Sequence, residues 1–187
     1  DEGYLLSDRA LGGADAYATA KTLAAAVRKL ENEKGPFDLI LCGKNSSDGD
    51  TFLVPPSFAE NLNIPHSTGV VDYILSEKSI EVKREIEDGF EHVELPLPAL
   101  LSVSKTVFPA RFPNVRLRLA ANRKEIPVFA AADLPVELND VGSKGSLTTV
   151  GGSFVPEHSK NCQMLHGSTD EESANMLVGA LSKKALI

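Results

Sequence analysis

The stretch that decides the fold is Leu41-Cys42-Gly43-Lys44-Asn45-Ser46-Ser47-Asp48-Gly49-Asp50-Thr51. It follows the apolar run 37–41, which is typical of a buried parallel strand, and it precedes residues 55–62, which have the pattern of a helix start. Open α/β sheets bind nucleotides at polar, glycine-containing loops between the carboxyl end of a strand and a helix. Small residues let the backbone approach a ligand, and helix N-termini favour phosphate. The stretch therefore predicts an α/β fold with a nucleotide loop.

The segments on either side of this loop have helical patterns. A helix is predicted after Asp15, its expected N-cap, and Lys34-Gly35-Pro36 is expected to end it. Its apolar stripe recurs at steps of three and four and consists of Ala16, Ala20, Leu23, Val27 and Leu30. A short helix is predicted over about 56–62. The order helix, strand, helix is typical of a parallel α/β sheet.

Strand patterns dominate the next part of the chain. Residues 67–76 are strand-like, and residues 79–86 alternate apolar and polar side chains, as a half-exposed strand does. Asp88-Gly89 predicts a hairpin turn because both residues tolerate positive φ, and residues 90–95 are the returning strand. Residues 97–103 are largely apolar and predict a central strand. The predicted fold class is α/β, doubly wound, with a mostly parallel sheet and an antiparallel hairpin.

Two irregular segments and a helix follow. Residues 104–124 show weak periodicity and predict an extended loop, and the glycine-containing residues 141–150 predict a flexible linker. Thr169 and Glu172 form a capping-box pattern before a helix expected over about 170–184, with Ala174, Leu177, Val178 and Leu181 as its apolar face. We therefore expect a nucleotide-binding domain over residues 1–145 and a C-terminal arm and helix over residues 146–187.

Composition narrows the possible partners. The 187 residues suffice for one buried core, and the net charge of −7 argues against nucleic acid or an anionic membrane as a partner. The two cysteines are too few for a disulfide framework or a metal set, so free thiols in a reducing, cytoplasmic compartment are expected. No apolar run approaches the ~20 residues of a membrane-spanning helix, so no membrane insertion is expected.

Metal and nucleophile chemistry find little support in the sequence. Asp48-Gly49-Asp50 is similar to the start of a calcium loop, but the twelfth position, where an EF-hand needs glutamate, is Ala59. Cys42 has no neighbouring base and is interpreted as a small strand-end residue. The histidines show no ligand spacing and are expected at the surface: His66, His92, His158 and His166. No metal ligand and no catalytic residue is predicted.

The same residues resemble a family. Cys-Gly-Lys-x-x-x-Asp-Gly-Asp-Thr over residues 42–51 is similar to the adenine-nucleotide loop of the electron transfer flavoprotein β subunit. Residues 5–15 resemble that family's segment between its third strand and third helix, and residues 97–103 resemble its last long strand. Residues 111–114 and 123–126 resemble its recognition loop and exit, and residues 153–157 and 164–169 its C-terminal arm. The likeness therefore covers nearly the whole chain in order.

The resemblance implies a fold, a cofactor and a site. The fold would be adenine-nucleotide α-hydrolase-like, with about two βα units expected before Asp1 that supply one wall of the site. The implied nucleotide is AMP or FAD, with a second FAD on the partner α subunit. The loop departs from the family pattern at Phe52, Leu53 and Pro55, which leaves the nucleotide's identity open. The implied cofactor-binding residues are Cys42, Gly43, Lys44, Asn45, Ser46, Ser47, Asp48, Gly49, Asp50, Thr51 and Val54.

The resemblance also implies partners. The chain would pair with an electron transfer flavoprotein α subunit through its C-terminal arm and accept electrons from acyl-CoA dehydrogenase-type donors. It would be an electron carrier subunit rather than a catalyst. The implied recognition loop lies at about 104–118, with Val107 and Phe108 as the apolar anchor beside Arg111 and Phe112. Asp8-Arg9 is either a loop salt bridge or, by resemblance, a strand end near the nucleotide pocket.

Two other protein classes fit parts of the sequence. A stand-alone adenine-nucleotide binding module of the stress-protein type would lack the long loop and the C-terminal arm. A hydrolase or ligase acting on an adenylate would need a phosphate-gripping and acid–base set, for which the sequence offers Lys44, Asp48 and Asp50. Nucleotide turnover by the purified chain separates the second class from the first.

Overall fold

The computed structural model describes residues 2–104, 110–156 and 162–186. The chain divides into two compact units, Asp1–Thr149 and Val150–Ile187, which we call the N-terminal unit and the C-terminal unit. The described residues of the N-terminal unit form two sheets and several helices, whereas those of the C-terminal unit include one helix. Each unit is described by itself.

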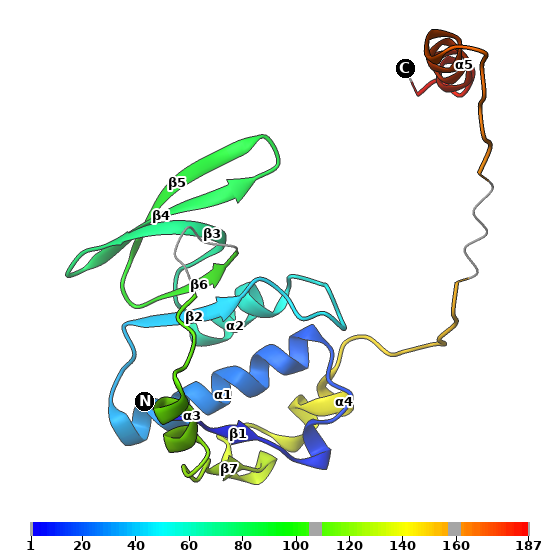
Figure 1. The fold of residues 1–187 in the computed structure, drawn as a ribbon. Coiled ribbons are helices and arrows are strands. Elements are labelled where there is room, and N and C mark those ends of the chain that lie inside the picture. The colour runs from blue at the N-terminus through cyan, green and yellow to red at the C-terminus, as the bar shows by residue number, and fades with distance from the viewer. Residues whose placement is uncertain (1, 105–109, 157–161, 187) are drawn as a thin grey trace. The chain divides into compact units, whose positions relative to one another are not determined.

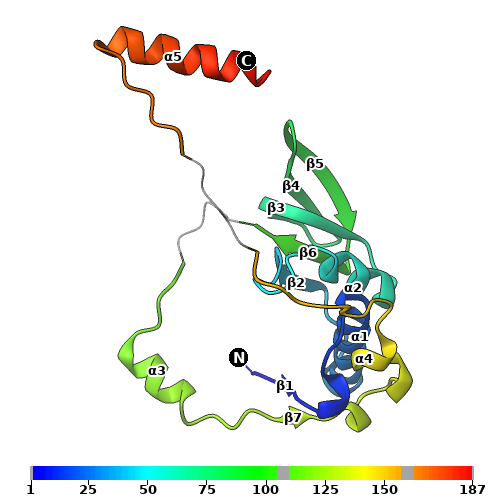
Figure 2. The same cartoon turned by 90° about the vertical axis from the view of Figure 1, so that its right-hand side faces the viewer.

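The main sheet of the N-terminal unit has five strands in the order β2-β6-β3-β4-β5 (Figure 1). Its strands are β2 (Leu39–Gly43), β3 (His66–Leu75), β4 (Ser79–Ile86), β5 (Gly89–Pro96) and β6 (Ala99–Val103). β2, β6 and β3 run parallel, and β3, β4 and β5 form an antiparallel meander. Figure 2 shows the twisted hairpin of β4 and β5 extending beyond the parallel strands. The predicted α/β fold with a mixed sheet and an added hairpin is confirmed.

The chain order explains the parallel arrangement. α2 (Val54–Leu62) connects β2 to β3, and β6 then inserts between these two strands. The carboxyl ends of all three parallel strands therefore lie at one edge of the sheet, where ligand sites of open α/β sheets are found. The loop after β2 leaves the sheet at this edge. One predicted turn is shifted: Ile86 pairs with Gly89, so Glu87 and Asp88 are the central turn residues rather than Asp88-Gly89.

The central strand β6 is buried on both faces. Ala99 and Leu101 point into one cluster with β3, β4 and β5 residues, and Leu100 points into the other cluster beneath the helices. Because successive strand residues alternate between faces, a continuous apolar run is needed at this position. This is why residues 99–103 lack the alternation seen in β4. The prediction of a central strand here is confirmed.

The long helix α1 (Ala16–Lys34) contacts both sheets (Figure 1). Ala20 and Ala24 pack with Phe58 of α2 and Leu100 of β6, while Ala25 and Ala26 pack beside the small sheet. That small sheet pairs β1 (Leu5–Leu6) with β7 (Val128–Phe129) in parallel. The predicted boundaries hold, since the Asp15 carboxylate accepts the Ala18 N–H at 2.9 Å and Gly35 ends the helix with φ 95°.

Short helices occupy both segments that the sequence predicts as irregular. α3 (Val115–Ala121) begins at Asn114, whose side chain caps the Leu117 N–H, so the extended-loop prediction for 104–124 is wrong over these residues. The remaining short elements of this unit are η1 (Arg9–Leu11), η2 (Ala131–Asp133), η3 (Leu138–Asp140) and α4 (Gly142–Gly145). The weak periodicity of residues 104–124 hides α3 because the helix is short and buries no face.

The predicted flexible linker at 141–150 is in fact anchored over much of its length. Gly142 has φ +60°, and a Cβ there would lie 2.0 Å from the Ala10 carbonyl oxygen. The Asp15 carboxylate accepts hydrogen bonds from the Leu147 and Thr148 N–H groups at 2.8 and 3.0 Å. The glycine here therefore permits close backbone packing and a left-handed conformation, rather than flexibility.

The C-terminal unit contains α5 (Asp170–Lys183), as predicted. The Thr169 hydroxyl accepts the Glu172 N–H at 3.2 Å, and the Glu172 carboxylate reaches back to the Ser168 N–H at 2.7 Å. The capping pattern is thus present, with the glutamate bonded one residue before the N-cap. Within the described residues of the C-terminal unit, Leu177 and Val178 of the apolar stripe of α5 are each 51% exposed.

Candidate functional site

The candidate nucleotide loop runs from the end of β2 to the start of α2. Cys42 and Gly43 are the last residues of β2, and Val54 is the first residue of α2. Residues 43–53 are exposed, whereas Cys42 and Val54, which lie at the two ends of the loop, are partly buried. β2 has a paired neighbour on its β6 side only, within the part of the chain that the structure describes. The structure thus brings the predicted loop residues together at the carboxyl edge of the sheet, beside a free strand edge.

The loop is held in shape by its own side chains. The Asn45 side-chain amide donates to the Asp50 carboxylate, and the Asp50 N–H donates to the Ser46 carbonyl at 3.1 Å. Asp50 and Phe52 have φ of +47° and +60°, a backbone region that non-glycine residues seldom adopt. A strained backbone conformation persists where surrounding bonds hold it in place, and such conformations are common at ligand sites. The Asn45–Asp50 contact is one such bond.

Hydrogen bonds within the loop favour the charged form of Asp48. The Ser46 hydroxyl, followed by the Asp48 and Gly49 backbone N–H groups, lowers the pKa of Asp48 below its usual value. A carboxylate accepts hydrogen bonds and repels phosphate, so Asp48 and Asp50 suit the hydroxyl groups of a ribose. Lys44 is the cation of this loop, and its ammonium nitrogen lies 5.5 Å from the centre of the Phe52 ring.

The start of α2 offers few donors for a phosphate. Pro55 and Pro56 occupy two of its first positions and have no N–H group, and the N-cap Leu53 has no side-chain capping bond. The Leu53 N–H faces the Thr51 hydroxyl at 3.5 Å. The sequence-based argument for phosphate at this helix N-terminus is therefore weakened. Lys44 is the better placed group for an anion.

Cys42 is a packing residue. It joins the apolar cluster beneath α1 and α2, and burial raises the pKa of its thiol. A thiol with a raised pKa is a poor nucleophile at neutral pH. In the described residues no cluster of histidine, cysteine, aspartate and glutamate could hold a metal ion.

A cavity next to the loop reveals residues that the sequence did not indicate. It has a volume of about 390 Å³ and is bordered by Lys44 and Phe52 of the loop together with residues of β3, β4 and β6. The additional polar residues are His66, Thr68, Arg84, Glu85 and Ser102. Ser102 donates to the Gly43 carbonyl at 3.2 Å and so ties β6 to the beginning of the loop. The pairing of β3 with β4 and with β6 brings these residues together, so no sequence spacing could have shown them.

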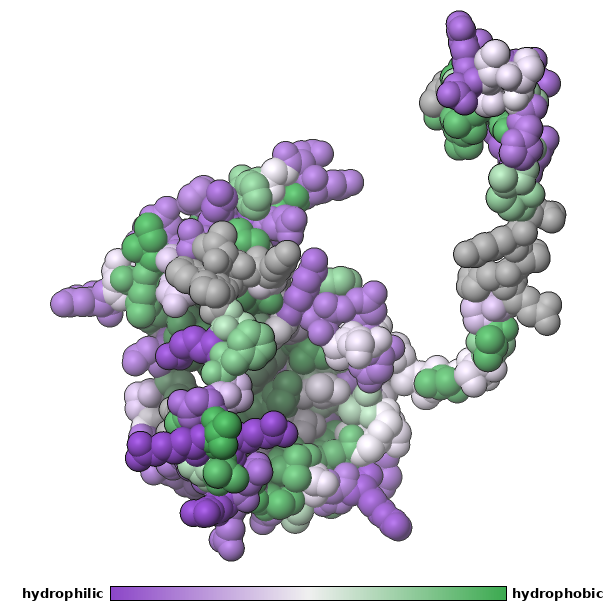
Figure 3. Space-filling view, in the orientation of Figure 1, coloured by the Kyte–Doolittle hydropathy of each residue, from purple (hydrophilic) through white to green (hydrophobic). Residues whose placement is uncertain are grey.

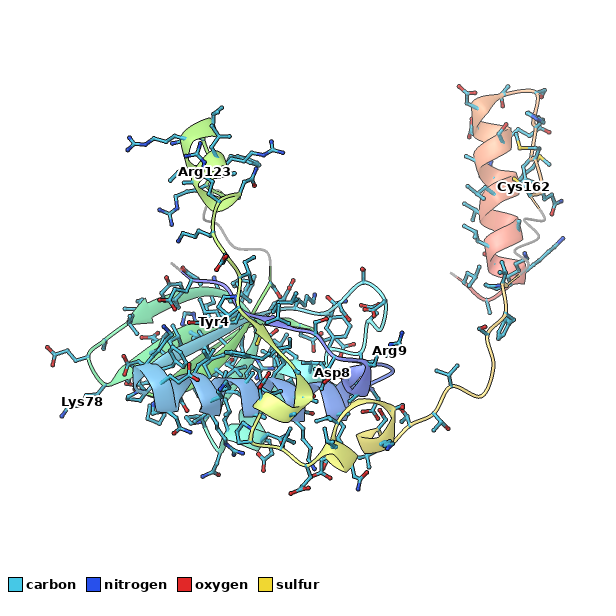
Figure 4. The ribbon with its side chains drawn as sticks, turned by 90° about the horizontal axis from the view of Figure 1, so that it is seen from below. Tyr4, Asp8, Arg9, Lys78, Arg123 and Cys162 are labelled. Carbon is cyan, nitrogen blue, oxygen red and sulfur yellow. The ribbon has the colours of Figure 1, made fainter. Side chains whose placement is uncertain are left out.

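The other predicted site residues are distributed as follows. Val107 and Phe108 lie outside the described residues. Arg111 and Phe112 are exposed, Phe112 by 89%. Asp8 and Arg9 follow β1 (Figure 4), and the Asp8 carboxylate accepts the Ala10 and Ala131 N–H groups at 2.9 and 3.0 Å. These bonds lower the pKa of Asp8, so its role here is to fix the turn after β1 to the segment after β7.

The fold and this loop define the class: an α/β protein with a polar loop at the carboxyl edge of its parallel strands. The comparisons give the family. The model of the electron transfer flavoprotein domain matches residues 1–134. The chain belongs to the electron transfer flavoprotein β-subunit family.

Individual relatives support this assignment. The chain is 38% identical to the electron transfer flavoprotein subunit beta of Thermoanaerobacterium thermosaccharolyticum, over 95% of this chain and 66% of the relative. It is 39% identical to the protein of the same name from Megasphaera elsdenii, over 93% and 65%. It is 37% identical to the caffeyl-CoA reductase-Etf complex subunit CarD of Acetobacterium woodii, over 100% and 70%. The chain thus spans about two thirds of the length of these relatives.

The described helices were compared with the requirements for a membrane-spanning segment. Among the residues that the structure describes, none of the helices has both the length and the apolar character needed to cross a membrane.

Proposed function

We propose that this chain acts in electron transfer as the β subunit of a heterodimeric electron transfer flavoprotein. In this role it binds an adenine nucleotide at residues 42–54, pairs with an α subunit that carries FAD, and accepts electrons from acyl-CoA dehydrogenase-type donors. The observation that carries the proposal is family membership over most of the chain, combined with the position of the loop at the carboxyl edge of the parallel strands.

The residues of the loop fit an adenine nucleotide. Asp48 and Asp50 supply acceptors for ribose hydroxyls, and Lys44 supplies a positive charge for a phosphate. The backbone at Gly43 leaves open space, since a Cβ there would meet no atom within 4 Å. These residues serve AMP and FAD equally, because the two share an adenosine and its first phosphate. When bound to the heterodimer, the flavin supplies the redox chemistry; this chain's residues bind and orient the nucleotide.

The C-terminal unit supports a subunit role over the stand-alone nucleotide module. An amphipathic helix gains most of its stability from burying its apolar face. Within the C-terminal unit, Leu177 and Val178 of this apolar face of α5 are each 51% exposed, so the face can be buried by another chain. We assign it to the α subunit. The free thiols Cys42 and Cys162 suit a reducing, cytoplasmic compartment.

The nucleotide assignment is tested on the complete protein co-expressed with its α subunit. The purified complex is denatured, and the released nucleotides are identified and counted by chromatography. We expect one adenine nucleotide in addition to the FAD of the α subunit. Asp48→Ala and Asp50→Ala are each expected to lower this second nucleotide, because each removes a ribose acceptor.

The matched control is Glu87→Ala, which removes an exposed carboxylate from the turn between β4 and β5. This variant is expected to keep the full nucleotide content. A wild-type complex that contains FAD on the α subunit and no further adenine nucleotide would contradict the proposed site. Equal nucleotide loss in all three variants would show that the loop carboxylates have no specific role.

A further inference from the structure

One carboxylate fastens the last residues of the N-terminal unit to the start of α1. The Oδ1 atom of Asp15 accepts the Ala18 N–H at 2.9 Å and so caps the helix. The Oδ2 atom accepts the Leu147 N–H at 2.8 Å, and the Thr148 N–H and hydroxyl at 3.0 and 3.1 Å. We call the bonds to Oδ2 the Asp15 clasp. The clasp joins residues that lie 132 and 133 positions apart in the sequence.

Neighbouring bonds hold the same two segments together. The Ser146 hydroxyl accepts the Asp15 N–H at 2.8 Å and donates to the Gly142 carbonyl at 2.9 Å. The Ser143 N–H donates to the Gly12 carbonyl at 3.0 Å. Residues 142–148 are therefore bonded to residues 12–15 near both of their ends, and the Asp15 clasp is the last of these attachments before the N-terminal unit ends at Thr149.

Polar bonds rather than apolar packing keep residues 146–148 in place. The side chain of Leu147 is 76% exposed although its N–H is bound to Asp15. Figure 3 shows pale and green atoms where the chain continues from α4 of Figure 1. A segment with few buried apolar contacts opens easily once its hydrogen bonds are removed. Loss of the Asp15 clasp is therefore expected to release this segment.

We propose that Asp15 is a positioning residue for subunit assembly. Its carboxylate orders the last residues of the N-terminal unit, so that the chain enters the C-terminal unit from a fixed point when α5 binds the α subunit. This inference rests on the proposed function, in which α5 contacts the α subunit. Association is weakened by every segment that has to be ordered at the moment of binding, and a segment that is already ordered avoids this loss of entropy.

The position requires a carboxylate because two oxygens accept hydrogen bonds from two segments. Serine offers one hydroxyl oxygen, which caps a helix well but does not reach a second segment at the same time. Asparagine offers one oxygen and one amide donor, and that donor cannot accept the N–H groups of Leu147 and Thr148. Asp15→Ser therefore removes the clasp while it keeps the cap of α1.

The test compares the complete protein with its Asp15→Ser variant. Circular dichroism is expected to show unchanged helix content, because serine still caps α1. Amide hydrogen exchange at Leu147 and Thr148 is expected to become fast, because the bonds to Oδ2 are lost. Titration calorimetry with the purified α subunit is expected to show roughly tenfold weaker binding. Asp15→Asn is expected to weaken binding to a similar extent.

The matched controls are two valine substitutions at adjacent threonines. Thr148→Val removes only the hydroxyl bond of the clasp, and we expect about twofold to threefold weaker binding. Thr149→Val makes the same change at an exposed residue whose side chain forms no hydrogen bond with the residues that the structure describes, and we expect wild-type affinity. Because Thr148→Val leaves the helix cap intact, it decides the question if Asp15→Ser lowers the helix content.

The outcomes separate this inference from the proposed function. If amide exchange at Leu147 and Thr148 accelerates in Asp15→Ser while the affinity for the α subunit is unchanged, the positioning role is refuted and the proposed function stands. Equal affinities of Thr148→Val and Thr149→Val, together with unchanged exchange in Asp15→Ser, would refute the clasp itself. If the wild-type protein does not bind the α subunit, the proposed function is refuted and the positioning role with it.

Discussion

The helices α1 and α5 share the same sequence signals and differ in what covers them. Each has a side-chain N-cap, at Asp15 and Thr169, and each has an apolar stripe. α1 packs against both sheets, and Ala20 of its predicted stripe is fully inaccessible while the other four members are partly buried. Within the C-terminal unit, Leu177 and Val178 of α5 remain 51% exposed. The comparison teaches that periodicity predicts a helix and its apolar face, but the partner of that face is set by the rest of the fold or by another chain.

The largest expected effect comes from the cluster beneath α1. Leu100→Ala removes a fully buried side chain that packs between α1, α2 and the sheet. We expect a loss of about 2–5 kcal/mol in the free energy of unfolding, because the deletion leaves a cavity. Urea denaturation followed by circular dichroism measures it. Leu117→Ala in the exposed α3 is the control, and an equal loss there would contradict the assigned core.

The next effect concerns the segment that anchors the start of α1. Gly142→Ala introduces a Cβ 2.0 Å from the Ala10 carbonyl oxygen at a position with φ +60°. We expect destabilisation of more than about 1 kcal/mol, since the backbone must move. Gly151→Ala, where a Cβ meets open space, serves as the control in the same thermal unfolding experiment. Equal melting temperatures would contradict the close packing at Gly142.

The N-caps of the two helices provide a smaller and more direct comparison. Asp15→Ala removes the bonds to the Ala18, Leu147 and Thr148 N–H groups, and we expect a loss of about 1–2 kcal/mol in the free energy of unfolding. Thr169→Ala is expected to reduce the helix content of α5 and to leave the unfolding of the N-terminal unit unchanged. A coincident loss of stability in both variants would mean that α5 is part of the main cooperative unit.

The hydrogen bonds to Asp15 also predict that the free energy of unfolding depends on pH. The hydrogen bond from Ala18, followed by those from residues 147 and 148, lowers the pKa of Asp15 in the folded protein. Its contribution to stability is therefore present above the unfolded pKa of about 3.9 and is lost as the pH falls through the lower folded pKa. Denaturation midpoints between neutral and acidic pH should fall less steeply for Asp15→Ala than for the wild type. Parallel curves would contradict the role of the charged carboxylate.

The smallest expected effect on stability is that of Leu177→Ala. Its side chain is half exposed, so we expect a change within about 0.5 kcal/mol for this chain alone. The same substitution is expected to weaken the complex with the α subunit about tenfold or more, because it deletes part of the proposed contact face. Titration calorimetry with the purified α subunit measures this, and Lys183→Ala on the same helix is the control. Unchanged affinity would remove α5 from the interface.

Much of the fold could be predicted from the sequence because local signals and burial agree. The stripe of α1, the alternation in β4 and the apolar run of β6 each predicted the correct element, with boundaries shifted by one or two residues. These patterns reflect which faces contact the core, and the fold satisfies them all at once. The strand order β2-β6-β3 could not be predicted from the sequence. β6 inserts between β2 and β3, and no local sequence pattern indicates this insertion.

The failures have a physical cause as well. The glycines of residues 141–150 predicted a flexible linker, yet Gly142 serves a backbone contact with Ala10, which is distant in sequence. The sequence did not predict α3 because a helix of seven residues without a buried face gives no periodic signal. At the candidate site the loop was located by sequence, whereas Arg84, Thr68 and Ser102 beside Lys44 are brought in by tertiary structure alone.

The most direct test of the central claim is anaerobic reduction of the flavin in the complex of this protein with its α subunit. The two proteins are co-expressed and purified, and flavin absorbance is followed as an acyl-CoA dehydrogenase and its substrate are added. The account predicts a one-to-one heterodimer whose flavin absorbance is lost only when both dehydrogenase and substrate are present. Failure of the two chains to co-purify, or a flavin that stays oxidised, would contradict a β-subunit role in electron transfer.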